Sequence, residues 1–187
     1  MTQAILAVLD SRSFTAPWFW LLLLLAWTLA GRRVLGVPGD VVNAARTPET
    51  GTSDSPEAVL LLDWLSLSLP RWRLGMHEGV LGFAFAAFVL SALAVLGFGY
   101  GLEMAQALVL LVLPFALLFA AELRLARRVA PLVAAAEAAE MPVNQAATDA
   151  ARLMARHRSL MALASVLVMA LIAWHAAVWV VTHPFGY

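Results

Sequence analysis

Long apolar runs constrain this chain more than any other feature of its sequence. Residues 76–100, 102–123 and 159–181 are each long enough to cross about 30 Å of hydrocarbon, which takes about 20 helical residues. Backbone polar groups in lipid must be paired within the spanning segment, so these runs predict α-helices. The chain is 63% apolar and 13% charged, whereas soluble domains carry about 25% charged residues. The sequence therefore predicts an all-α integral membrane protein.

A fourth transmembrane helix is predicted over residues 17–37. Its apolar run, 17–30, is interrupted by Gly31, Arg32 and Arg33 before the apolar character resumes. Arginines near a helix end can extend their side chains to the interface, which keeps a span plausible. A signal peptide is the alternative, but its charges should precede the apolar stretch rather than follow it. We therefore expect an uncleaved helix.

The arginines predict the orientation of these helices. The chain has 12 basic residues, all of them arginine, and only Arg12 lies outside two blocks at residues 32–73 and 124–158. Cationic loops next to membrane spans remain in the cytoplasm. We therefore expect cytoplasmic segments at about 38–75 and 124–158, with both termini outside, which is the periplasm if the membrane is a bacterial inner membrane.

The two cytoplasmic segments differ in character. Residues 44–56 are polar with several helix breakers and predict a mobile loop, whereas 57–70 is apolar and of a length suited to lying in the interface. Residues 124–158 are rich in alanine and predict a helical arm that breaks near Pro142. This arm is expected to be a solvated helical connector, and an arm lying along the headgroups is the alternative.

The second span carries a packing signal. The link at residues 97–101 is short enough to make the second and third helices a tight antiparallel hairpin. Small residues on one stripe of the second helix allow close helix contact, which drives association in lipid; they are Gly75, Gly79, Gly82 and Ala86, with Gly97 further along. We expect the partner to be a helix of this chain, with the closest contact in the cytoplasmic half. A helix of another subunit is the alternative.

Composition excludes several functions. A net charge of zero offers no basic surface for nucleic acid. Without cysteine the chain can hold no disulfide, thiolate metal centre or iron–sulfur cluster of its own. No glycine-rich phosphate loop or nucleophile elbow is present. The sequence thus predicts no catalytic residue, no metal site and no cofactor.

Two sets of polar residues are the remaining candidates for a binding site. His77, Glu78, Glu122 and His157 lie near the predicted cytoplasmic boundary, and two histidines at one depth are a pattern that can hold haem. Half-solvated groups at a span end need no ligand, however, and His157 lies between two arginines. We expect no haem or metal there.

The other set is predicted on the opposite side and consists of Glu103, Gln106, His175 and His183. His175 is the most deeply placed histidine, and Glu103 is its natural partner by depth. A membrane-embedded ionisable group is a functional candidate because it must face protein or water. Quinone contact or a proton relay is one interpretation, and a structural hydrogen bond between the third and fourth helices is the favoured one.

Several short motifs resemble a family of small alphaproteobacterial membrane proteins that often carry the name "component of SufBCD complex". The motifs are Asp10-Ser11-Arg12-Ser13-Phe14, Trp18-Phe19-Trp20, Leu35-Gly36-Val37-Pro38, Leu96-Gly97-Phe98 and Ala105-Gln106-Ala107. The resemblance implies a multi-span organisation. It also implies a link to iron–sulfur assembly, in which this cysteine-free chain would anchor or regulate the complex.

Two functions follow as expectations. The first is a non-enzymatic membrane subunit or anchor, with a protein partner or a second copy of the chain. The second is a small redox or transport component, with b-type haem, quinone or a proton path, that uses Glu103 and His175.

Overall fold

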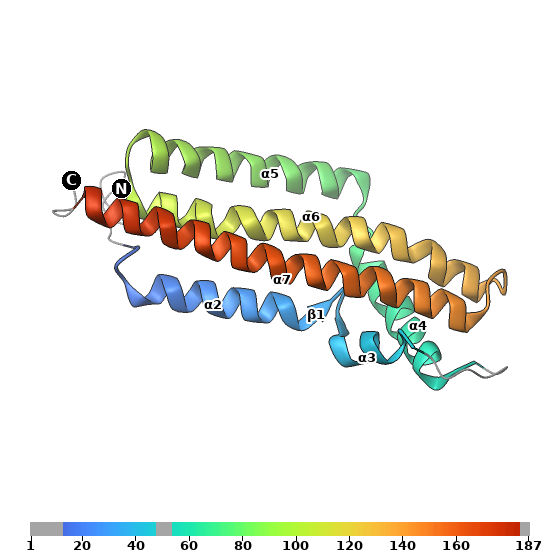
Figure 1. Cartoon of the computed structure of the whole chain (residues 1–187). Helices are drawn as coiled ribbons and strands as arrows, with labels where there is room; N and C mark the ends of the chain where they lie inside the picture. The colour runs from blue at the N-terminus through green and yellow to red at the C-terminus, as the bar shows by residue number, and fades with distance from the viewer. Residues whose placement is uncertain (1–12, 48–53, 184–187) are drawn as a thin grey trace. The chain divides into compact units, whose positions relative to one another are not determined.

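The computed structural model describes residues 13–47 and 54–183, which are mostly helical (Figure 1). The helices are α2 (Pro17–Arg32), α3 (Gly39–Ala44), α4 (Pro56–Ser68), α5 (Met76–Ala94), α6 (Glu103–Glu137) and α7 (Val143–Thr182). A 3-10 turn, η1 (Leu69–Trp72), follows α4, and a π turn, η2 (Val95–Gly99), follows α5. The strands β1 (Arg33–Val34) and β2 (Val37–Pro38) have two residues each. Residues 48–53 of the mobile loop predicted at 44–56 lie outside the described residues, as does Arg12.

Three of these helices are long and apolar enough to cross a membrane: Met76–Gly99, Glu103–Glu137 and Val143–Thr182. With 35 and 40 residues, α6 and α7 extend about 52 and 60 Å at about 1.5 Å per residue, well beyond a bilayer core of about 30 Å. The predicted helical character of 124–158 is therefore confirmed. So is the break, because α6 ends at Glu137 and α7 begins at Val143. Proline restricts the preceding residue and removes a donor.

Helix α2 is shorter than predicted. It ends at Arg32, so the prediction that the helix continues to residue 37 is wrong. Residues 33–38 instead form an antiparallel hairpin in which Val34 pairs with Val37. Its turn has positive φ at Leu35 (54°) and Gly36 (84°), as in a type I′ turn, and glycine is the residue best suited to that conformation. The 16 residues of α2 extend only about 24 Å.

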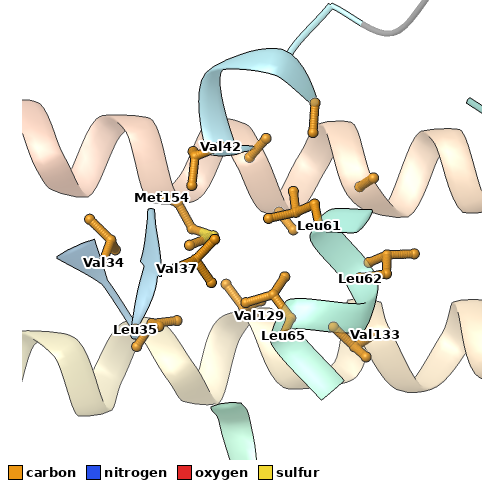
Figure 2. Close-up of a cluster of buried hydrophobic side chains, with 14 of the residues drawn as sticks. Val34, Leu35, Val37, Val42, Leu61, Leu62, Leu65, Val129, Val133 and Met154 are labelled. Carbon is orange, nitrogen blue, oxygen red and sulfur yellow. The ribbon is translucent and has the colours of Figure 1, made fainter. Parts of the chain in front are cut away.

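The chain divides into two compact units, and the second contains Leu29–Leu74 and Leu118–Leu163. Its core is a hydrophobic cluster to which α4, α6 and α7 contribute (Figure 2). Leu61 and Leu65 of α4 are fully buried, as is Met154 of α7. The Ser55 hydroxyl accepts a hydrogen bond from Ala58 N at 3.2 Å and so caps α4. The opposite face of α4 is exposed and apolar, with Leu60, Trp64 and Leu67.

The alanine-rich arm is part of this core. Four alanines of α7 are fully buried: Ala146, Ala147, Ala150 and Ala151. The expectation of a solvated connector is therefore wrong. Alanine has no side-chain entropy to lose and lets neighbouring backbone approach, so the alanines that suggested a bare helix form a packing face.

The first unit contains Gly75–Leu117, the residues up to Thr28 and those from Ala164 onward. Among its described residues, none of α5 is buried. A Cβ added at Gly82 would meet no atom within 4 Å, and one at Gly75 would meet only Glu78 of the same helix. The closest approach is instead at Gly97, where an added Cβ would lie 2.7 Å from the backbone nitrogen of Gln106. It therefore occurs after α5 rather than in its predicted cytoplasmic half.

Candidate functional site

The Glu103 cluster comprises Glu103, Gln106, His175 and Trp179, all in the first unit. Glu103 is the first residue of α6 and is 8% exposed. One carboxylate oxygen, Oε1, accepts hydrogen bonds from the backbone nitrogens of Ser13 at 2.5 Å and Phe14 at 2.6 Å. The other, Oε2, accepts one from Trp179 Nε1 at 3.2 Å.

Gln106 lies one turn further along α6 and is almost fully buried. Its side-chain nitrogen donates to the Gly97 carbonyl at 2.8 Å, and its oxygen lies 2.9 Å from His175 Nε2. Because the amide nitrogen is already the donor to Gly97, the amide oxygen must be the acceptor, and His175 Nε2 carries the hydrogen. His175 Nε2 is therefore the donor in this contact.

Aromatic rings enclose the imidazole of His175. Phe14 and Phe98 both meet it edge-on, with ring centroids at 5.5 and 5.7 Å. Such edge-to-face contacts are favourable and fix the plane of the ring. His183 lies apart from His175 and stacks on Trp179 with a centroid distance of 4.0 Å.

The cluster forms two hydrogen bonds between α6 and α7, Glu103 to Trp179 and Gln106 to His175. The expected partnership of Glu103 with His175 is not present: each of the two residues bonds to a different side chain. Glu103 instead meets two backbone N–H groups and an indole. This arrangement corresponds to the structural interpretation of the polar set.

Several participants were not predicted from the sequence. Trp179 was not among the predicted polar residues, yet its indole N–H donates a hydrogen bond to Glu103. The backbone groups of Ser13, Phe14 and Gly97 carry no side-chain signature at all. The one signal in the sequence was the Glu103 carboxylate next to an apolar run. A carboxylate only accepts hydrogen bonds, so when it is buried it requires donors from elsewhere in the protein.

The predicted boundary set is distributed over both units. His77 and Glu78 are exposed, and Glu78 accepts a hydrogen bond from Gly75 N at 3.2 Å. His157 belongs to the second unit, and its Nε2 is buried without a hydrogen-bond partner among the described residues. Burial lowers the pKa of His157, which lies before the apolar part of α7, so the imidazole is uncharged at neutral pH. Over residues 13–47 and 54–183, no three His, Asp or Glu side chains are grouped closely enough for a metal ion.

Comparisons with protein-family models, with curated proteins and with solved structures find no match to this chain.

Proposed function

We propose that this chain is a non-enzymatic subunit or anchor of a larger complex in a bacterial inner membrane. The observation that carries the proposal is the packed second unit. Residues outside the three long apolar runs form a hydrophobic core of their own, with Leu61, Leu65 and Met154 fully buried. A rigid platform of this kind suits the binding of a partner better than mobile loops would.

The Glu103 cluster supports the same proposal. Its carboxylate oxygens and the Gln106 amide already have partners within the protein. The bonds to Trp179 and His175 join α6 to α7. A catalytic group needs a donor or acceptor that is free to contact the substrate. Buried polar groups whose hydrogen bonds are all made within the protein contribute to stability instead.

In the proposed topology the chain crosses the membrane four times, with α5 and α6 as an antiparallel hairpin and both arginine blocks in the cytoplasm. The clustering of arginines supports this orientation. Helix α2 falls short of the hydrocarbon thickness, and a short span is accommodated by local thinning of the bilayer. The open stripe around Gly82 on α5 supports contact with a helix of another subunit.

Reporter fusions after Gly51 and Asn144 test the topology, since both should report a cytoplasmic location. Reporters on opposite sides would contradict the four-span arrangement.

Purification of the full chain in mild detergent, followed by mass spectrometry, tests the subunit role. We expect a stoichiometric partner or a second copy of the chain. A monodisperse monomer without a partner, obtained also after cross-linking in intact membranes, would contradict the proposal. Recovery of SufBCD proteins would identify the complex that the family resemblance implies.

The alternative, a redox or transport component that uses Glu103 and His175, predicts a different result. A b-type cytochrome would show a Soret band in the absorption spectrum of the purified chain.

A further inference from the structure

A pocket of about 240 Å³ lies between α6 and α7 in the second unit. Arg124, Leu125 and Arg128 of α6 line one side, and Arg156, His157 and Leu160 of α7 line the other. Both helices contribute residues at the same spacing, i, i+1 and i+4, which places them within about one turn. The volume is several times the roughly 30 Å³ that one water molecule occupies in the liquid, so a phosphate group fits.

Over residues 13–47 and 54–183, no acidic side chain neutralises the positive charge of this pocket. No acidic residue lines the pocket. Among the described residues, Arg124, Arg128 and Arg156 form no ion pair, whereas Arg152, one turn from Arg156, does meet Asp149 at 3.5 Å. Three guanidinium groups facing one space repel one another, and an anion between them would relieve that repulsion. His157 is uncharged at neutral pH, so the charge is supplied by the arginines.

The shape of the charged groups favours phosphate. Guanidinium groups donate two parallel hydrogen bonds to phosphate or carboxylate oxygens, and several of them can surround one tetrahedral anion. Leu125 and Leu160 provide an apolar wall in the same pocket. The long apolar stretch of α6 ends just before Arg124, and that of α7 begins just after Arg158. The pocket is therefore formed by residues at the ends of both predicted spans, the level at which lipid phosphates lie.

We propose that the pocket lined by Arg124, Arg128, Arg156 and His157 binds a phosphate group, supplied by the headgroup of an anionic phospholipid. Free inorganic phosphate shares this chemistry and is the other source to be distinguished. The site goes beyond the proposed subunit role and does not depend on it, because lipid binding is measured on the purified chain without a partner.

The test uses the full chain in detergent, titrated either with phosphatidylglycerol in phosphatidylcholine micelles or with inorganic phosphate. The midpoint of thermal unfolding, followed by tryptophan fluorescence, gives an apparent affinity for each probe. Arg128→Gln removes one pocket charge. Arg127→Gln is the matched control: it removes the same charge from the neighbouring exposed position, which does not line the pocket. Far-UV circular dichroism verifies that both variants fold.

We expect saturable stabilisation by phosphatidylglycerol, weakened about tenfold by Arg128→Gln and less than about twofold by Arg127→Gln. Further weakening in Arg124→Gln/Arg128→Gln would support the same site. Competition of inorganic phosphate with the lipid would support the phosphate site and identify free phosphate as a second occupant. Equal weakening by Arg127→Gln and Arg128→Gln would overturn the proposal, because it indicates general charge attraction. An absence of any response to both probes would overturn it as well.

Discussion

Replacement of Gly97 by alanine should destabilise the fold where the π turn η2 packs against the start of α6. An alanine Cβ there would lie 2.7 Å from Gln106 N and 3.0 Å from the carbonyl carbon of Ala105. Both atoms belong to the backbone, so neither can rotate away as a flexible side chain would. The close approach of the π turn to the start of α6 must therefore open.

The cost has two parts. Overpacking against rigid neighbours costs about 1–3 kcal/mol. Separation of the two segments also weakens the 2.8 Å bond from Gln106 to the Gly97 carbonyl, worth about 0.5–1.5 kcal/mol. The higher helix propensity of alanine opposes these losses by up to about 1 kcal/mol. We expect a net loss of about 2 kcal/mol.

Gly82→Ala is the matched control on the same helical segment. A Cβ at Gly82 would meet no atom of this chain within 4 Å, so in detergent without a partner subunit the substitution should be neutral or stabilise by about 0.5–1 kcal/mol. Titration of each detergent-solubilised variant with sodium dodecyl sulfate, followed by far-UV circular dichroism, compares their midpoints. Opposite signs for the two variants are expected. Equal shifts in the same direction would refute the close approach at Gly97.

Three further predictions test other parts of the structure. Glu103→Gln replaces one acceptor oxygen with a donor that faces N–H groups, so it should destabilise by about 1.5–3 kcal/mol in the same titration; an unchanged midpoint would show that the carboxylate is not buried among donors. Leu61→Ala empties a fully buried site and should cost about 2–5 kcal/mol, whereas Leu60→Ala, on the exposed face of α4, should cost far less; similar losses from both would contradict the burial pattern. Because burial lowers the pKa of His157 below its ordinary 6.5, the unfolded chain binds more protons and stability falls as the pH drops below about 6.5. His157→Gln should flatten that fall in thermal unfolding between neutral and acid pH, and an unchanged slope would assign it to other groups.

Much of the helical framework could be predicted because hydropathy reports directly on burial in lipid. The three long runs, and the break before Val143, follow from apolar length and from Pro142. The end of α2 could not be predicted, since the hairpin at Leu35 and Gly36 depends on backbone angles that hydropathy does not encode. The burial of the α7 alanines could not be predicted either, because alanine occurs both on solvated helices and in tight helix contacts.

Three members of the candidate site, Glu103, Gln106 and His175, could be predicted from the sequence, but their hydrogen-bond partners could not. The position of each residue along its predicted span indicated that Glu103, Gln106 and His175 lie at a similar depth in the membrane. The rotation of each helix decides which side chains meet, and that rotation depends on packing. Glu103 consequently accepts hydrogen bonds from Trp179 and from two backbone nitrogens, and backbone donors cannot be predicted from residue type.

The positions of the three donors to Glu103 along the chain determine when each of these hydrogen bonds can form during synthesis of the protein. They come from positions 13, 14 and 179, while the acceptor lies at position 103. The carboxylate therefore leaves the ribosome long before its last donor has been translated. Until Trp179 has been translated, Oε2 of Glu103 lacks the indole N–H that donates to it in the folded protein.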